Sequence, residues 1–251
     1  MFPAGTRDSY VQTVGDFLEF LGKRSLQQAT PLDAEAYLLV NWLTGRIRRG
    51  SHRTAVEALE HFAAVTPELD WGPGSLGRPV RWRPAPVSFP SASVRQLFKA
   101  PIPLKNRVML DLLYRGGLRP LELLALTPGD LELFPGTLSI PAPGRITGRI
   151  IYLPDDLADT LETYLQRAAP EDFLFEARPG QAHHPAFLKA VLREAAQLAG
   201  LKRRIGSQTL RYTRARQMLE GNKDPQWVAR WLGWGRPRAW DRVIPDGEPE
   251  R

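Results

Sequence analysis

The sequence predicts a mainly α-helical protein of two parts, with a small β-hairpin or sheet in the second part. Apolar residues recur at helical spacing through most of the chain, and glycine and proline gather between Trp71 and Pro90. Two short segments rich in apolar and β-branched residues, Thr137–Ile140 and Arg149–Leu153, are typical of strands. The chain has 251 residues, of which 43% are hydrophobic, enough for one large domain or two modest ones.

The first part, residues 1–72, is expected to form a small helical domain. Thr30 followed by Pro31 is typical of a helix start, with Thr30 as the N-cap and Pro31 in the first turn. The apolar periodicity predicts three helices, over Ser9–Leu21, Ala34–Thr44 and Ser51–Val65.

The net charge of the chain is +7, and its distribution is uneven. Up to Pro90 the basic and acidic residues nearly balance, so almost all of the excess positive charge lies from Ser91 onward. A basic domain favours a polyanionic partner, most often nucleic acid. The alternative is compositional, because arginine far outnumbers lysine, as in proteins of GC-rich genomes.

Residues 73–90 are expected to link the two parts, because glycine and proline break helices and strands. Arg78, Arg81 and Arg83 alternate with Trp82 in this linker. The segment is interpreted either as a basic strap that crosses a DNA groove or as a semi-rigid connector in solvent.

The second part, residues 91–251, is expected to combine helices with the β-hairpin. The loop between the two strands is basic and contains Arg145, so we expect the hairpin to have a long, positively charged tip. Helices are predicted over Ser93–Phe98, Asn106–Tyr114, Asp156–Ala168, Ala186–Ala199, Ser207–Leu219 and Pro225–Leu232.

Several classes of protein are excluded by composition. The chain has no cysteine, which excludes disulfides and thiolate metal sites and fits a cytoplasmic protein. No stretch of 18 apolar residues occurs, so we expect no membrane span and no membrane partner, and the first residues predict no secretory signal. The pair His183–His184 lacks helical spacing and a carboxylate neighbour, so it is interpreted as a loop, and we expect neither a metal nor a cofactor.

Two arginine-containing segments carry the chemistry. The first is Gly117-Leu118-Arg119, with Glu122 three residues after the arginine and a leucine-rich continuation. The second is Gln208-Thr209-Leu210-Arg211-Tyr212-Thr213, followed downstream by Leu232-Gly233-Trp234. In this order, with the hairpin between them, they resemble the two arginine boxes of the tyrosine recombinase (phage integrase) family, in its Xer-like form. The resemblance covers nearly the whole chain and implies a helical core-binding domain followed by an α+β catalytic-type domain.

The resemblance implies that Arg119 and Arg211 hold a DNA phosphate. A phosphodiester under attack gathers negative charge on its non-bridging oxygens, and a guanidinium group can bind two of them at once, which a lysine cannot. The implied partners are double-stranded DNA and other recombinase protomers. Arg78, Arg81, Arg83 and Arg149 are the further residues that we expect to contact DNA.

Three family positions depart from the usual residues. The hairpin lysine that donates a proton is missing, and the nearest cations, Arg145 and Arg149, hold their protons too firmly to be good acids. Gln208 stands where the family has a histidine, and it can donate a hydrogen bond but cannot shuttle protons. Trp234 replaces a second histidine, a change that also occurs in some active members.

The largest departure is the nucleophile. The family's tyrosine would fall at Val243, which has no hydroxyl group to attack phosphorus. The first hypothesis is therefore a DNA-binding family member, used in DNA recombination or integration, that is inactive or impaired in cleavage. The second is an active recombinase with a displaced tyrosine, such as Tyr212 or Tyr152, or one lent by a partner. The third is a helical interaction protein without DNA binding.

Overall fold

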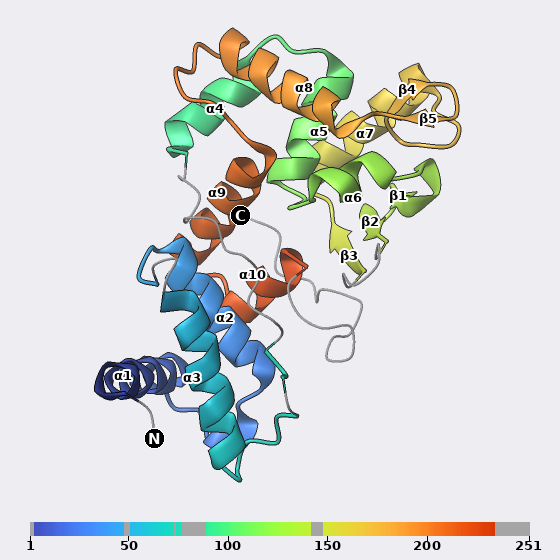
Figure 1. The fold of residues 1–251 in the computed structure, drawn as a ribbon. Coiled ribbons are helices and arrows are strands. Elements are labelled where there is room, and N and C mark those ends of the chain that lie inside the picture. Colours follow the sequence, from blue (N-terminus) through green and yellow to red (C-terminus); the bar gives the residue numbers. More distant parts are fainter. Residues whose placement is uncertain (1–2, 48–50, 73, 77–88, 142–147, 234–251) are drawn as a thin grey trace.

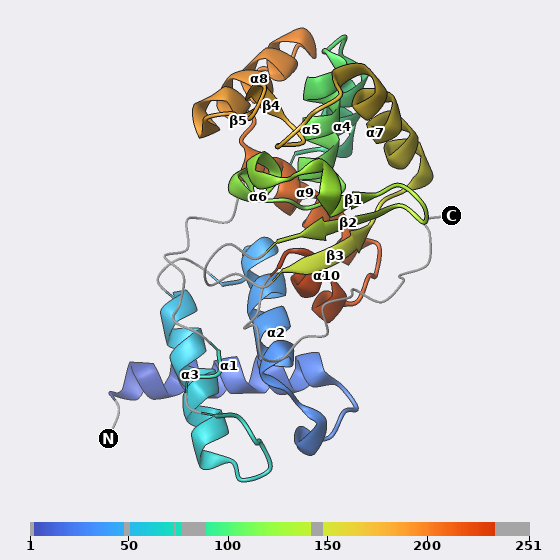
Figure 2. The ribbon, with the colours of Figure 1, turned by 90° about the vertical axis from the view of Figure 1, so that its right-hand side faces the viewer.

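The computed structural model describes residues 3–47, 51–72, 74–76, 89–141 and 148–233. Its first part consists of α1 (Ala4–Leu21), α2 (Pro31–Leu43) and α3 (Ser51–Val65). The helices of the second part are α4 (Ser91–Lys99), α5 (Leu104–Tyr114), α6 (Pro120–Ala125), α7 (Asp155–Ala168), α8 (Pro185–Leu198), α9 (Ser207–Glu220) and α10 (Pro225–Trp231). Figures 1 and 2 show α1 to α3 at one end of the molecule and the other elements, apart from α10, at the opposite end.

The second part holds two small antiparallel sheets. One has the order β1-β2-β3, with β1 at Leu131–Glu132, β2 at Thr137–Ile140 and β3 at Arg149–Tyr152. The pairing of Ile140 with Arg149 brings the first residue of β3 opposite the last residue of β2. The other sheet is a short hairpin of β4 (Glu176–Arg178) and β5 (Gln181–Ala182).

The first part has a core of its own between its three helices. Phe17 of α1 and Leu59 of α3 are fully buried, and the ring of Phe17 meets that of Tyr37 of α2 edge-on at 5.6 Å. The start of α2 is fixed by its capping residues. The Thr30 hydroxyl accepts a hydrogen bond from the Asp33 N–H, and the Asp33 carboxylate accepts one from the Thr30 N–H at 2.8 Å.

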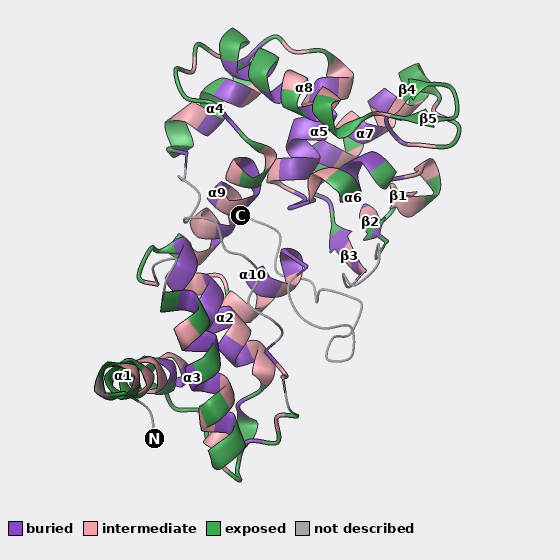
Figure 3. Ribbon diagram, viewed as in Figure 1, coloured by how far each residue is buried: buried purple, intermediate pink, exposed green. Residues whose placement is uncertain are grey.

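Helix α2 also belongs to the core of the second part. Leu39, Trp42 and Leu43 are at most 5% exposed, and they join the large cluster built by the helices and strands after residue 89. Figure 3 shows α2 buried along much of its length, and α10 lies beside it. Each fully buried side chain of this size contributes about 1.5–3 kcal/mol, so the contact is a substantial part of the fold.

The predicted fold class is confirmed. The two predicted strands and the helices predicted from periodicity occur within a few residues of the expected bounds. Helix α3 begins and ends at the predicted residues. The prediction missed β1 and the β4–β5 hairpin, whose strands are two or three residues long and too short for an alternating pattern. The tip of the predicted hairpin and most of the linker lie outside the described residues, so the domain boundaries stay a prediction. Within the described residues, no helix has the length and hydropathy needed to cross a membrane.

His52 gives the fold a testable pH dependence. Its side chain is 4% exposed in α3, and burial lowers the pKa of the imidazole to about 4. The unfolded chain therefore binds more protons between pH 4 and 6.5, and the stability from this group is lost as pH falls through that window. We expect the unfolding free energy of the protein to fall by up to about 3 kcal/mol more than that of His52→Leu over this range.

The measurement is urea unfolding at pH 4.5 to 7 for the wild type, His52→Leu and a control, His61→Leu. His61 is exposed on the same helix, so its replacement should leave the pH dependence unchanged. The buried Asp111, with a pKa raised to about 6 by burial, acts in the opposite direction but is common to all three proteins. Equal pH slopes for the wild type and His52→Leu would contradict a neutral buried imidazole.

Candidate functional site

Gly117 allows the first arginine segment to lie against α10. Its φ is 63°, and a Cβ atom there would lie 2.7–2.8 Å from three ring atoms of Trp231. Any side chain would therefore push α10 away from the turn that precedes Arg119. The glycine of the motif is required by packing, before any chemistry is considered.

The Glu122 carboxylate organises the start of α6. One oxygen accepts the backbone N–H of Arg119 at 2.7 Å, and the other accepts from the Arg119 guanidinium at 3.1 Å. Glu122 lies at the third position of α6, from which a carboxylate can reach back to the N-cap residue. Glu122 is 1% exposed, so its carboxylate is buried.

Arg149, the first residue of β3, is the second cation on this carboxylate. Its two terminal nitrogens donate to the two Glu122 oxygens at 2.9 and 3.1 Å, and one of them also donates to the Gly117 carbonyl at 3.2 Å. Arg149 is 5% exposed, and its Nε has no acceptor among the described residues. A Cβ atom on Gly233 would lie 2.7 Å from its Nη1, so the end of α10 also rests on this guanidinium.

Arg211 of α9 is the third cation and is 1% exposed. Its Nε donates to the same Gly117 carbonyl at 2.7 Å, its Nη1 to Gln208 Oε1 at 3.4 Å, and its Nη2 to the Leu232 carbonyl. The Arg119 guanidinium donates to the next carbonyl, Gly233, at 3.0 Å. Two successive carbonyl oxygens after α10 thus each accept from one motif arginine.

The arginine cluster, defined as Arg119, Arg149 and Arg211 around Glu122, carries three positive charges and one negative charge. The pKa of Arg211 is lowered to about 9, mainly by burial and also by the neighbouring Arg119 and Arg149, against the opposing effects of Tyr212 and Glu122. Burial would raise the pKa of Glu122, but hydrogen bonds and charge from Arg149 and Arg119 outweigh it and hold this pKa below its usual value. Since a guanidinium group keeps its proton in proteins, three arginines and one carboxylate give the cluster an excess of two positive charges.

The structure brings together three of the residues predicted from sequence, Arg119, Arg211 and Gln208. Arg149, predicted as a DNA contact, lies in the same cluster with its terminal nitrogens on Glu122 and Gly117, so its DNA contact stays a prediction. The sequence reasoning gave no role to Glu122, although its spacing from Arg119 was visible. The remaining predicted positions lie outside the described residues: Arg78, Arg81, Arg83, Arg145, Trp234 and Val243.

The first part of the chain touches the second arginine segment directly. The ring of Trp42 on α2 meets that of Tyr212 edge-on at 4.7 Å, next to Arg211 in sequence. Gln226 of α10 donates a hydrogen bond to Asp33 at the start of α2. The Thr213 hydroxyl accepts from the Phe89 N–H at 3.0 Å, which fixes the end of the linker on α9.

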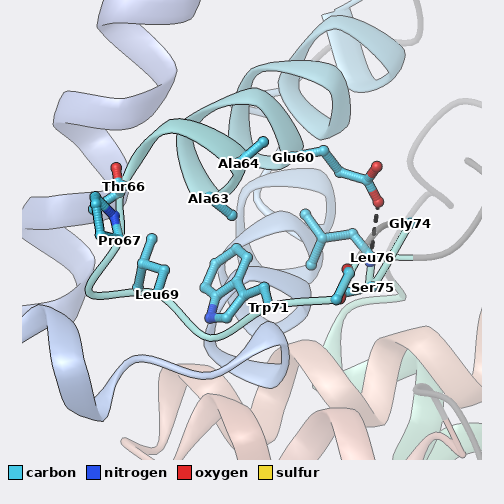
Figure 4. Close-up of a pocket in the computed structure, with 11 residues that line it drawn as sticks. Glu60, Ala63, Ala64, Thr66, Pro67, Leu69, Trp71, Gly74, Ser75 and Leu76 are labelled. Atoms are coloured by element: carbon cyan, nitrogen blue, oxygen red, sulfur yellow. Dashed lines mark hydrogen bonds between the residues drawn. The ribbon is translucent and has the colours of Figure 1, made fainter.

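A cavity of about 510 Å³ lies elsewhere, at the end of α3 (Figure 4). Trp71, Leu69 and Leu76 line it, and its carboxylate, Glu60, accepts a hydrogen bond from the Leu76 N–H at 3.1 Å. It contains none of the residues of the arginine cluster, and the described residues that line it include no lysine, arginine or histidine.

The paired histidines have structural contacts at the start of α8. His184 is the N-cap of the helix, and its Nδ1 accepts from the Ala186 N–H at 3.2 Å. The His183 ring stacks on Phe187 at 3.7 Å, and its Nε2 lies 2.9 Å from the Lys105 Nζ.

Comparisons with known proteins show which family and which fold the chain resembles. The family model described as "Phage integrase family" matches residues 90–240. The chain is 27% identical to tyrosine recombinase XerD of Corynebacterium glutamicum, over 92% of this chain and 84% of that protein. It is 28% identical to XerD of Pseudomonas putida and 34% identical to a tyrosine recombinase of Pseudothermotoga lettingae, and it spans 60% and 45% of their lengths.

Two solved structures share the fold. The XerA recombinase has a TM-score of 0.56 at 22% identity, covering 92% of this chain and 84% of that one. XerH recombinase, in a pre-cleavage complex with its difH substrate, has a TM-score of 0.53 at 20% identity, covering 90% and 72%. Since the family model covers more than half of the residues, including both arginine segments, this chain belongs to the phage integrase family of tyrosine recombinases.

Proposed function

We propose that this chain binds double-stranded DNA as a member of a recombination system, with a backbone phosphate held at Arg119 and Arg211. The observation that carries the proposal is the arginine cluster, in which three largely buried guanidinium groups have one carboxylate beside them, which pairs with Arg119 and Arg149. Burying cations without counter-charge is costly, and a phosphate at this place would supply the missing negative charge.

Both motif arginines keep N–H groups that donate to no described residue. A guanidinium group has five N–H bonds, and Arg211 uses three of them on protein acceptors. Arg119 is the more accessible of the two, with a side chain 22% exposed. Planar pairs of N–H groups match the oxygens of a phosphodiester, and charge-assisted bonds of this kind are about twice as strong as neutral ones.

Glu122 and Arg149 are proposed to be positioning residues. Glu122 orients the Arg119 guanidinium and its backbone N–H together, and Arg149 connects Glu122 to the Gly117 carbonyl that also receives Arg211. The two motif arginines are therefore linked through protein groups and not only through a shared ligand.

Strand cleavage is proposed to be absent or impaired. Val243 cannot attack phosphorus, and Gln208 cannot move protons near neutral pH. The alternative, an active recombinase with a displaced nucleophile, rests on Tyr212, which directly follows Arg211. Its ring packs against Trp42, which argues against a free approach to DNA. We also propose that other protomers bind the same DNA. The proposed location is the cytoplasm, whose reducing conditions agree with a chain that has no cysteine.

Arg119→Ala should weaken binding to a duplex by about tenfold to a hundredfold, because a charge-assisted contact contributes about 1.5–3 kcal/mol. Arg119→Lys should recover only part of this affinity, since an ammonium group cannot form the planar pair of bonds. Binding is measured by fluorescence anisotropy, with thermal unfolding to verify the fold. Arg115→Ala is the matched control, with a side chain 24% exposed and an ion pair to Asp156. Equal decreases in affinity for Arg119→Ala and Arg115→Ala would contradict a specific phosphate contact.

Glu122→Gln and Arg149→Ala should each destabilise the protein by about 3–5 kcal/mol, because each leaves a buried charge without its partner. The unfolding free energy is measured in urea. Glu57→Gln, which breaks the exposed Arg53–Glu57 pair, is the control and should change stability little. Wild-type stability of Glu122→Gln would show that the arginine cluster does not depend on this carboxylate.

A nicked suicide duplex, which traps cleaved strands, should give no covalent protein–DNA product on a denaturing gel. The reason is the missing hydroxyl group at Val243, since family chemistry passes through a phosphotyrosine. Tyr212→Phe and Tyr152→Phe are run beside the wild type. A shifted band that disappears in one of these variants would establish a relocated nucleophile and refute the proposal that cleavage is absent.

A further inference from the structure

The positive charge of the chain is concentrated around the second arginine segment. Between Ala195 and Leu219 the sequence has six lysine and arginine residues and no aspartate or glutamate, in a chain whose net charge is +7. Such a segment attracts polyanions, and its field is strongest where the cations are exposed and have no acidic partner.

Three of the six cations already have contacts within the protein. Arg211 is buried in the arginine cluster, Arg214 lies over the Tyr114 ring at 5.7 Å, and Arg216 pairs with Glu220 at 2.8 Å. The other three form the basic loop, defined as Lys202, Arg203 and Arg204, between α8 and α9.

All three side chains of the basic loop are exposed, and none forms an ion pair or a hydrogen bond within the described part of the chain. Holding three adjacent like charges together is unfavourable unless an anion is near, and no described residue forms an ion pair with them. The loop is nevertheless held in place, because Ile205 directly after it is 8% exposed and packs in the main core.

The basic loop lies close to the arginine cluster along the chain. Arg204 is three residues before α9, which rises about 1.5 Å per residue, so its Cα lies within about 16 Å of that of Arg211. One DNA strand carries a phosphate about every 3.4 Å of helix axis, so this distance corresponds to fewer than about five phosphates. The N-cap of α9 is Gly206, whose lack of a side chain leaves the helix without a side-chain cap at its positive end.

We propose that Lys202, Arg203 and Arg204 form a second DNA contact, which binds the sugar–phosphate backbone beside the phosphate held at Arg119 and Arg211. This inference rests on the proposed function, because it assigns the same duplex to both contacts. The basic loop supplies affinity without sequence preference, and the arginine cluster fixes the position of one phosphate.

The test compares the wild type with a triple variant, Lys202→Ala, Arg203→Ala and Arg204→Ala, on a 30-base-pair duplex of random sequence. Affinity is measured by anisotropy at several salt concentrations, and thermal unfolding verifies the fold. A matched control removes the same charge elsewhere, at Arg178, Lys189 and Arg193, which are exposed on β4 and α8. The variant Lys202→Arg, Arg203→Lys and Arg204→Lys keeps the charge of the basic loop, and Arg119→Ala tests the arginine cluster in parallel.

We expect the alanine triple variant to bind at least tenfold more weakly at 100 mM salt, with unchanged unfolding. The slope of log affinity against log salt should become shallower by about 0.9 for each phosphate that the variant no longer neutralises, up to about 2.7 for three. The control and the charge-keeping variant should retain most of the wild-type slope.

Three other outcomes separate the inference from the proposed function. If Arg119→Ala weakens binding while the alanine triple variant keeps the wild-type slope, the inference fails and the proposed function stands. If the triple variant and the control weaken binding equally, the effect is net charge and the inference is overturned. If the wild type binds no duplex in low salt, the proposed function fails first, and the inference falls with it.

Discussion

The arrangement of the site depends on one buried carboxylate. Glu122 accepts hydrogen bonds from the guanidinium groups of Arg119 and Arg149, and it accepts the backbone N–H at the start of α6. Without it, three cations, two of them buried, would lie together with no carboxylate to offset their charge. The Gly117 carbonyl connects the other pair of arginines, since it accepts hydrogen bonds from both Arg149 and Arg211. A carboxylate and a carbonyl, close together in sequence, thus hold side chains from α9, β3 and the start of α6 in one place.

Much of the fold could be predicted because periodicity reports local structure. Helix α3 and strand β2 have the predicted bounds, and Thr30 with Pro31 marks the start of α2, whose first turn the prediction placed a few residues late. The short strands could not be predicted. Leu131–Glu132 and Gln181–Ala182 are two residues long, and their pairing depends on neighbours that a single sequence does not reveal.

In the site, too, the residues within a motif could be predicted from the sequence, whereas the contacts between distant segments could not. Arg119 and Arg211 could be predicted because the two motifs keep their order and their arginines, and Gln208 because it lies three residues before Arg211, although the family has a histidine there. The position of Arg149 could not, since an arginine at the base of a basic hairpin is expected to face solvent, whereas its side chain is 5% exposed beside Glu122. The contacts of Arg211 and Arg119 with the carbonyls of Leu232 and Gly233 could not be predicted either, because every residue has a backbone carbonyl and the residue type does not show which of them accepts a hydrogen bond. Only the fold, through the close approach of α10 to Gly117, brings them to the arginines.

Helix α2 contributes to both hydrophobic cores, and its Trp42 can report on the contact between the two parts of the chain. Trp42 is 5% exposed and its ring packs edge-on against Tyr212, beside one of the arginines of the site. Any movement that separates the first part of the chain from α9 and α10 must transfer this indole into water. The emission of Trp42 would then shift to longer wavelength, and because the chain has seven tryptophans, the difference in emission between the wild type and Trp42→Phe would report the separation of the two parts.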